Sequence, residues 1–519
     1  MNDKKSYLLA IDNGTQSVRA LAFDLDGQLV AKSKVDIEPF FSERPGWAEQ
    51  HAEYFWDKLC EACQLLWPQL DFPRSAIRAV ALTTQRATVV NLDRDGKPLR
   101  PAIVWLDQRE QHQLPGMGIW GPVLSMVGAR DSIRSFRSQA EANWIKAQQP
   151  EIWQQTARFL LLSGYHSYKL TGKYVDSVAS QVGYLPFDFK RQQWCGPRDW
   201  KWKALPITRQ QLPELVPAGG VLGLITAEAA RETGIPAGLQ LISAGADKAC
   251  EVLGSGCLAP TTGSLSYGTT ATYNTVDTRY LEMIRQVPAY PGAVPQTYNC
   301  ETIVQRGYWM VNWFKREFGQ PEQSLAAERG VAPEALFDDL LRQAPPGSMG
   351  LVLQPYWSPG LRIPGPEAKG AIIGFGDIHT RAHVYRAIIE GLAYALREGR
   401  ERHEKRSGHK IDTLKVSGGG SQSDQAMQIT ADVFGLKAER PHTYETSGLG
   451  AAINAAVGAG LYPDYQTAQA RMTHSGTVFT PIAGNVRIYD QLYREVYSML
   501  YGRLAPLYKS IRAITAYPA

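Results

Sequence analysis

Short apolar runs alternate with amphipathic segments along the first half of the chain, and their periods predict strands and helices in turn. The strands expected here cover residues 7–35 in two or three segments, 77–83, 88–92, 97–104 and 240–244. The expected helices cover about 52–67, 138–172 and 247–253. Asp-rich turns ending in glycine, at 24–27 and 93–96, separate the strands of two of these groups.

The second half of the chain begins the same alternation again. Its expected elements are a hairpin over 263–276, a long helix over about 381–404, a strand over 413–416 and a helix over about 423–434. Strands that alternate with helices in both halves indicate an α/β protein. Because Gly254, Gly256 and Gly263 cluster between the halves, we expect two domains, 1–255 and 256–519.

Two segments, one in each half, have the same pattern of strand, tight Gly-Thr turn and strand. The first runs over residues 8–24 and turns at Gly14-Thr15, and the second runs over 262–275 and turns at Gly268-Thr269. Glycine lets backbone N–H groups approach a phosphate closely, and the hydroxyls add further donors. The pair of hairpins predicts a nucleotide held between two related domains.

The composition fits a two-domain globular protein. The chain has 519 residues, of which 44% are hydrophobic and 20% charged, so each half is long enough to bury its own core. The formal net charge of +5 is small for this length, and there is no long basic run. Nucleic acid is therefore not an expected partner, although a modest positive charge suits anionic ligands.

The six cysteines are too few for a disulfide framework in a chain of this length. Cys60 and Cys63 form the one close pair, and without further ligands at metal spacing they do not predict a zinc or redox site. The polar residues 1–7 lead directly into a strand, and no apolar stretch approaches the roughly 20 residues that span a bilayer. We expect no membrane partner and a cytoplasmic location.

Six groups of residues together resemble the FGGY family of carbohydrate kinases over essentially the whole chain. In order they are Asp12-x-Gly14-Thr15-x-x-x-Arg19, Pro45 to Gln50, Trp105-x-Asp107-x-Arg109, Gly245-Ala246-Asp247, Gly268-Thr269-Thr270 and Gly418-Gly419-Gly420. The segments 370–375 and 383–390 are also close to the family's carboxy-terminal signature. One Gly-Thr turn is weak evidence, whereas six motifs in register are specific.

The resemblance implies two actin/hexokinase-type (ribonuclease H-like) α/β domains with an interdomain active-site cleft. It also implies a phosphotransferase with an alcohol group as acceptor, which uses ATP and Mg²⁺ to phosphorylate a small sugar, ketose or polyol. The sugar would bind mostly on the first domain and ATP mostly on the second. Family members are often dimers or tetramers, so a homodimer is compatible with the resemblance.

Phosphoryl transfer needs a metal, donors around the phosphates and a base for the attacking hydroxyl. Asp247 follows an apolar strand and begins a helix, and the resemblance makes it the general base. Asp12 and Asp247 are the expected metal-binding carboxylates, with Asp12 holding Mg²⁺ through water. The alternatives are an ordinary turn aspartate for Asp12 and a helix cap for Asp247.

The expected acceptor site combines side chains from several segments of the first domain. The resemblance assigns to it Gln85, Arg86, Trp105, Asp107, Asp247 and Lys248. An aromatic ring packs on a sugar face while a carboxylate accepts hydroxyl protons, which is the role expected of Trp105 and Asp107. Alternatively, Trp105 belongs to the core and Asp107 pairs with Arg109.

Lys248 departs from the familiar subgroups of the family. Glycerol kinases and xylulokinases usually have an amide side chain immediately after the catalytic aspartate. A lysine at this position contacts a substrate carboxylate, or lowers the pKa of Asp247, or forms an (i, i+3) pair with Glu251. Pentuloses, deoxy-ketoses, tetritols and aldonic acids all remain open as substrates.

The resemblance assigns the ATP site to both Gly-Thr turns and to two later segments. The residues are Gly14, Thr15, Gln16, Arg19, Gly268, Thr269, Thr270, Gly307, Asn312, Gly418, Gly419, Gly420 and Ser423. Arg19 has the alternative interpretation of a surface cation, and a triple glycine is often only a flexible turn. Two other functional classes also stay open: a nucleotide-dependent conformational protein of the same fold, and a sugar sensor on a kinase scaffold.

Overall fold

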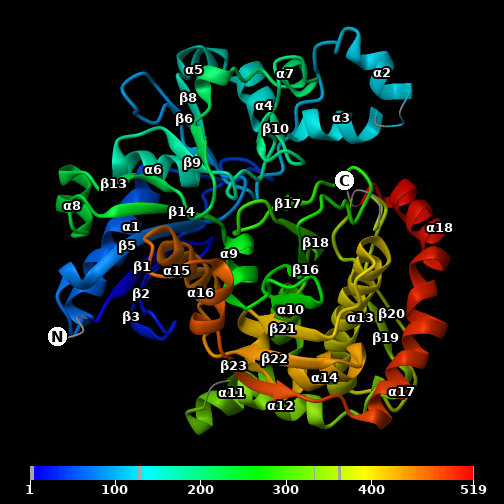
Figure 1. Ribbon diagram of the computed structural model, residues 1–519. Helices are drawn as coiled ribbons and strands as arrows, with labels where there is room; N and C mark the ends of the chain where they lie inside the picture. The colour runs from blue at the N-terminus through cyan, green and yellow to red at the C-terminus, as the bar shows by residue number, and fades with distance from the viewer. Residues whose placement is uncertain (1–4, 127, 129, 332, 361–363, 518–519) are drawn as a thin grey trace. The chain divides into compact units, whose positions relative to one another are not determined.

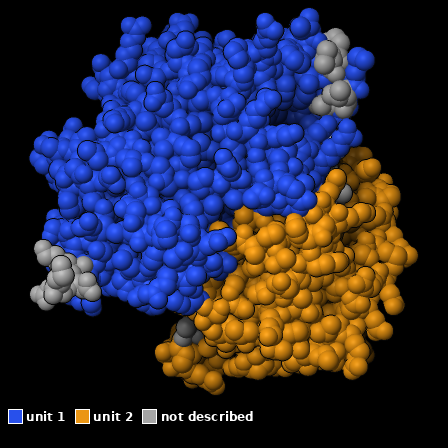
Figure 2. All heavy atoms as spheres, viewed as in Figure 1, with its two compact units in different colours: residues 1–256, 277–299, 445–474 blue, residues 257–276, 300–444, 475–519 orange. Residues whose placement is uncertain are grey.

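The computed structural model describes residues 5–126, 128, 130–331, 333–360 and 364–517. The chain forms two compact units (Figure 2). Unit 1 consists of residues 1–256, 277–299 and 445–474, and unit 2 of 257–276, 300–444 and 475–519. These units differ from the two continuous domains expected from the sequence, because the segments 277–299 and 445–474 pack within unit 1.

Unit 1 is built around a six-stranded sheet with the order β13-β14-β5-β1-β2-β3 (Figure 1). Its strands are β1 (Tyr7–Asn13), β2 (Ser17–Asp24), β3 (Leu29–Asp36), β5 (Ile77–Thr84), β13 (Val221–Leu224) and β14 (Gln240–Ala246). β1 to β3 form an antiparallel meander, which confirms the predicted strands of residues 7–35. β14, β5 and β1 run parallel, so their carboxyl ends lie at one edge of the sheet.

Helices cover both faces of this sheet. Leu9 and Ile11 of β1 pack in one cluster with Phe55 of α1 (Ala52–Leu66), a helix whose bounds match the expected 52–67. The opposite face of β1, β5 and β14 carries α15 (Thr446–Gly458), which also packs tightly on α9 (Asp247–Gly254). β1 is therefore buried on both faces, as its uninterrupted apolar run requires.

The crossing of α9 and α15 depends on two glycines. A Cβ on Gly254 would lie 2.0 Å from the Thr446 carbonyl oxygen, and one on Gly450 would lie 1.9 Å from the Cys250 carbonyl oxygen. No other residue allows the two backbones to approach this closely. The contact packs the last residue of α9 against the first residue of α15, so the two helices lie closely together along most of α9.

The remaining elements of unit 1 form smaller sheets and short helices. The strands of the smaller sheets are β4 (Glu49–Gln50), β6 (Val89–Leu92), β7 (Ala102–Ile103), β8 (Arg158–Leu161), β9 (Val175–Ser177), β10 (Phe187–Asp188), β11 (Gln193–Trp194) and β12 (Glu214–Val216). The remaining strand, β17 (Tyr290–Pro291), pairs with Tyr298 and Asn299. The other helices are α2 (Trp120–Met126), α3 (Arg130–Gln139), α4 (Glu141–Gln148), α5 (Pro150–Gln155), α6 (Leu162–Thr171), α7 (Lys201–Ala204), α8 (Ala227–Thr233) and α16 (Tyr465–Met472).

Two sequence predictions for this region were wrong in detail. Residues 138–172 are not continuously helical, because β8 pairs with β6 between α5 and α6. The expected strand over 97–104 is reduced to the two residues of β7. A short apolar run is compatible with either a strand or a buried helix, and only its pairing partner decides between them.

Unit 2 contains a second mixed sheet with the strand order β18-β16-β15-β21-β22-β23. Its strands are β15 (Thr262–Tyr267), β16 (Ala271–Asp277), β18 (Tyr298–Val304), β21 (Thr413–Ser417), β22 (Lys437–Pro441) and β23 (Ser475–Phe479), and β19 (Val352–Gln354) pairs with β20 (Ala371–Ile373) apart from it. The helices are α10 (Trp309–Phe318), α11 (Gln320–Arg329), α12 (Pro333–Arg342), α13 (Arg381–Ser407), α14 (Asp424–Phe434), α17 (Ala483–Leu492) and α18 (Ser498–Thr515).

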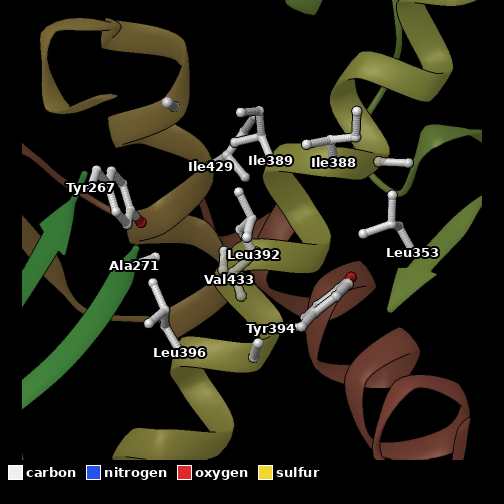
Figure 3. Close-up of a cluster of buried hydrophobic side chains, with 14 of the residues drawn as sticks. Tyr267, Ala271, Leu353, Ile388, Ile389, Leu392, Tyr394, Leu396, Ile429 and Val433 are labelled. Atoms are coloured by element: carbon white, nitrogen blue, oxygen red, sulfur yellow. The ribbon is translucent and has the colours of Figure 1, made fainter. Parts of the chain in front are cut away.

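The core of unit 2 forms around α13, which confirms the predicted long helix. Ile388, Leu392 and Leu396 point from α13 into a cluster that includes Ile429 and Val433 of α14 (Figure 3). The helix is buried around most of its circumference between residues 385 and 397. No helix among the described residues is long and apolar enough to cross a membrane.

Candidate active site

The first Gly-Thr turn connects β1 to β2 and brings Asp12 to the edge of the sheet. The Gly14 N–H donates to the Ser17 carbonyl at 3.1 Å, which closes the turn. The Thr15 hydroxyl accepts a hydrogen bond from Trp105 Nε1 at 3.0 Å. Trp105 is exposed, so it does not belong to the core. Gln16, at the tip of the turn, is also exposed.

Asp12 lies in a network of charges within unit 1. Its Oδ2 atom accepts from Arg19 Nη1 at 3.1 Å, and the same nitrogen lies 3.3 Å from Glu445 Oε2. Lys32 pairs with the other oxygen of Glu445. Burial raises the pKa of Asp12 to about 6, Arg19 opposes this rise, and the nearby carboxylate of Asp247 reinforces it.

Asp247 occupies the first position of α9, directly after β14 (Figure 1). Its Oδ1 atom accepts from the Lys248 backbone N–H at 2.7 Å and lies 3.8 Å from Arg86 Nε. Burial raises the pKa of Asp247, while Arg86 and Lys248 oppose the rise. A carboxylate with a raised pKa beside polar groups has the character of a proton acceptor.

Gln85 and Arg86 follow β5, the strand between β1 and β14. Gln85 is 3% exposed, and its amide oxygen and nitrogen have no hydrogen-bond partner in the part of the chain that the structure describes. The Arg86 guanidinium lies over the ring of Tyr290, 5.2 Å from its centre. A buried amide without hydrogen-bond partners costs free energy in the folded protein.

Lys248 forms the (i, i+3) ion pair with Glu251 that was one of the alternatives predicted from the sequence. Its Nζ atom lies 2.5 Å from Glu251 Oε2, one turn along α9, and the two side chains are 20% and 9% exposed. The pair is therefore largely enclosed rather than on an open surface. Glu251 neutralises the lysine charge next to Asp247.

Asp107 is held almost entirely by protein groups. Its two oxygens accept from Arg109 Nε at 2.7 Å and Nη2 at 2.6 Å, and Oδ2 also accepts from the Ala48 N–H at 2.6 Å. Arg109 itself lies between the rings of Trp47 and Trp144. The pairing of Asp107 with Arg109, the alternative interpretation from the sequence, is thus present and fixes the loop that carries Trp105.

The second Gly-Thr turn lies in unit 2, between β15 and β16. The N–H of Tyr308 donates to the Gly268 carbonyl at 3.1 Å, and that of Trp309 to the Thr269 carbonyl at 3.3 Å. A Cβ on Gly307 would lie 2.2 Å from the Ala271 nitrogen. Gly307 thus lets the start of α10 approach this turn closely.

Two of the other residues assigned to the ATP site lie on these elements. Thr270 completes the second Gly-Thr turn and is half-buried, and Asn312 is exposed on α10.

The triple glycine follows β21 and packs against two aromatic residues, Tyr267 and Tyr308. Gly418 has a φ of +83°, and a Cβ on it would lie 2.8 Å from the Tyr267 backbone. A Cβ on Gly420 would lie 2.1 Å from the ring of Tyr308, whereas Gly419 faces open space. Ser423 caps α14, accepting from the Ala426 N–H at 3.0 Å. Part of this loop is therefore shaped by packing, and Gly419 is its open position.

The structure also brings in residues that sequence reasoning missed. Glu445 precedes the small-residue helix α15 and reaches the Asp12 network only through the packing of α15 on the sheet. Tyr290 comes from the connection between β16 and β18. No local pattern marks either residue, since both contacts join distant segments. Among the described residues, no group of three His, Cys, Asp or Glu side chains is arranged to hold a metal ion.

Comparison with known proteins assigns the whole chain to one family. The model of the FGGY family of carbohydrate kinases matches with its N-terminal domain over residues 7–254 and with its C-terminal domain over 263–459. The uncharacterized sugar kinase YgcE of Escherichia coli (strain K12) is 31% identical over 508 residues, which cover 96% of this chain and 93% of that protein.

A second relative and a solved structure support the same family. The xylulose kinase of Lactococcus lactis subsp. lactis (strain IL1403) is 27% identical over 500 residues, covering 96% of both chains. The crystal structure of xylulose kinase from Rhodospirillum rubrum superposes with a TM-score of 0.78 at 26% identity, covering 97% of this chain and 100% of that one. The actin/hexokinase-like α/β fold and the transfer of a phosphoryl group to an alcohol are thereby confirmed, and the chain belongs to the FGGY family of carbohydrate kinases.

Proposed function

We propose that this protein transfers the γ-phosphoryl group of Mg·ATP to a hydroxyl of a small sugar, ketose or polyol, with Asp247 as the general base. The observation that carries the proposal is the half-buried Asp247 carboxylate at the start of α9, 3.8 Å from Arg86, whose pKa is raised by desolvation. A base of this kind has a greater affinity for a proton than an exposed aspartate.

The acceptor site combines the Gln85 amide, the Arg86 guanidinium and the Asp247 carboxylate. These groups directly follow β5 and β14, neighbouring parallel strands whose carboxyl ends lie together. The amide donates to and accepts from hydroxyls, and the guanidinium donates to them. The exposed ring of Trp105 offers a flat apolar surface for a sugar face. Asp107 acts indirectly in this proposal, by holding the Trp105 loop through Arg109.

The pair of Lys248 and Glu251 bears on the class of acceptor. An unneutralised lysine beside Asp247 would favour a sugar acid, but Glu251 lies 2.5 Å from its ammonium group. We therefore favour a neutral polyhydroxyl acceptor over an aldonic acid. Relatives of this chain carry the names xylulose kinase, glycerol kinase and autoinducer-2 kinase, and a gluconate kinase from Lactobacillus acidophilus has the same fold, so the preference for a neutral acceptor rests on the pair of Lys248 and Glu251 and not on these names.

On the nucleotide side, the backbone N–H groups and hydroxyls of the two Gly-Thr turns are the proposed phosphate donors. Asp12 is the proposed ligand for Mg²⁺, through water, and its single buried carboxylate suits an ion that keeps most of its hydration shell. When bound, Mg²⁺ would neutralise charge on the β- and γ-phosphate oxygens. Gly419 offers open space for the approach of the adenosine part.

The test is a coupled ADP-release assay with Mg·ATP against a panel of ketoses, polyols and sugar acids. We expect one or more neutral members to raise ADP release well above the background hydrolysis of ATP. A response to sugar acids alone would contradict the neutral acceptor. Intact ATP binding without stimulation by any member would instead support a sugar sensor or a conformational ATPase.

A further inference from the structure

One pocket of unit 1 lies away from the residues of the candidate active site. It has a volume of about 460 Å³ and is formed by α2, α3 and the loop that follows Arg109. The two helices contact one another and form a small outlying pair (Figure 1). None of the residues proposed to bind the acceptor or ATP lines this pocket.

Three arginines from α3 line one side of the pocket. Arg130, Arg134 and Arg137 follow the spacing i, i+4, i+7, which brings them to one face of the helix. Arg130 and Arg134 are exposed and form no hydrogen bond or ion pair with any described residue. Their charges are therefore available to a ligand that enters the pocket.

Arg137 is fixed more firmly than the other two. Its Nη2 atom donates to the Pro115 carbonyl at 2.5 Å, which orients the guanidinium, while its Nε–H is buried and has no acceptor among the described residues. Burial lowers the pKa of Arg137, because no described residue supplies a counter-charge that offsets the loss of hydration of its guanidinium group. An anion in the pocket would supply both an acceptor and a counter-charge.

No described lining residue is acidic. Asp131 lies about 100° around the helix from Arg130, off the arginine face. Glu110 is not among the lining residues; its Oε2 atom lies 3.6 Å from His112 Nε2, and its Oε1 atom accepts from Gln139 at 3.4 Å. The pocket therefore has a strong excess of positive charge.

The other walls of the pocket are apolar. They are formed by Leu114, Met117, Leu124 and Ile133. Inorganic anions leave such surface in contact with water, whereas an organic group would cover it. Three guanidinium groups match a dianion with several acceptor oxygens better than a monovalent carboxylate.

We propose that this pocket binds a small organic phosphate monoester, with its phosphate on Arg130, Arg134 and Arg137 and its organic part on the apolar walls. The proposal is independent of the proposed function, because binding here requires no turnover and no residue of the acceptor site. It assigns the protein a second ligand site for a phosphorylated metabolite.

The test is calorimetric titration of the full chain with phenyl phosphate, in the presence of saturating ADP so that the nucleotide site is filled. We expect binding in the wild type and at least a tenfold loss of affinity in the double variant Arg130→Gln/Arg134→Gln. The matched control is Arg78→Gln/Arg94→Gln, which removes two exposed arginines of the same unit and the same net charge. This control should bind like the wild type.

Hydrogen–deuterium exchange with phenyl phosphate should show protection in residues 112–137. Absence of binding in the wild type, or an equal loss in both double variants, would overturn the proposal. Inorganic phosphate that binds as tightly as phenyl phosphate would overturn the role of the apolar walls. Protection confined to residues 268–270 or 418–420 would assign the ligand to the nucleotide site instead. Since none of these readouts involves phosphoryl transfer, their failure is distinguishable from failure of the proposed kinase activity.

Discussion

Arg19 and Asp12 stand directly opposite one another in the β1–β2 ladder, and Arg19 Nη1 lies 3.1 Å from Asp12 Oδ2. The same guanidinium reaches Glu445, so it joins two carboxylates of unit 1. Arg19 is therefore not an isolated surface cation. It helps to keep Asp12 ionised against the effect of burial.

The first prediction concerns the pH dependence of activity. Burial raises the pKa of Asp12 to about 6, and Arg19 opposes this rise. Arg19→Gln removes the opposing charge, so the pKa should rise further and Asp12 should lose its ionised form at a higher pH. If Asp12 must be ionised to hold Mg²⁺, the acid limb of kcat should move up by about one pH unit. Lys34→Gln, on the neighbouring strand, is the control and should leave the limb unchanged. A profile that does not move in Arg19→Gln would contradict the role of Asp12.

The second prediction tests the general base. Asp247→Asn keeps the size of the side chain but removes the proton acceptor, so kcat should fall by several orders of magnitude while ADP binding remains close to normal. Steady-state turnover and ADP calorimetry measure the two quantities. Asp36→Asn, which alters an exposed side chain, should have no effect on either. Near-normal turnover of Asp247→Asn would show that another group accepts the proton.

The third prediction uses the unsatisfied amide of Gln85. Gln85→Met retains a similar volume but removes a buried amide that has no partner among the described residues, so the free energy of unfolding should rise by about 1–3 kcal/mol. The same change should raise KM for the acceptor, because the hydroxyl-binding group is lost. Chemical denaturation and steady-state kinetics provide the measurements. Lower stability together with an unchanged KM would indicate a structural role for the amide.

The fourth prediction separates the two interpretations of Lys248. If the pair with Glu251 is its main role, Lys248→Gln should leave acceptor preference unchanged and should destabilise the fold by about 1–3 kcal/mol, since Glu251 remains buried without its cation. The double variant Lys248→Gln/Glu251→Gln should recover much of this loss. Changed relative kcat/KM values across the acceptor panel would instead favour a substrate contact.

The fifth prediction compares two adjacent glycines of the loop after β21, which is the proposed adenosine-binding loop. Gly420→Ala introduces a Cβ that would lie 2.1 Å from the Tyr308 ring, so we expect weaker ADP binding and a loss of about 1–3 kcal/mol in stability. Gly419→Ala meets no atom within 4 Å and serves as the matched control. Equal effects of the two substitutions on the ADP Kd would contradict a packing role for Gly420.

Several elements could be predicted because their signals are local. The Asp-rich turn between β2 and β3, the two Gly-Thr hairpins and the long apolar pattern of α13 each lie within one continuous segment. β8 was missed because residues 158–161 are an apolar run inside a helix-like region, and its strand conformation depends on hydrogen bonds to β6. Likewise, the inclusion of 277–299 in unit 1 depends on contacts with distant segments.

By itself the sequence determined the alternation of strands and helices, the two Gly-Thr turns and the presence of Asp12, Asp247 and the Gln85-Arg86 pair at strand ends. Only the tertiary structure decided which charges are neighbours. Glu445 joins Arg19 and Lys32 because α15 packs on the sheet and on α9, through a crossing that needs Gly254 and Gly450. Electrostatic interactions depend on distance and burial in the folded chain, and neither is encoded in the local spacing of residues.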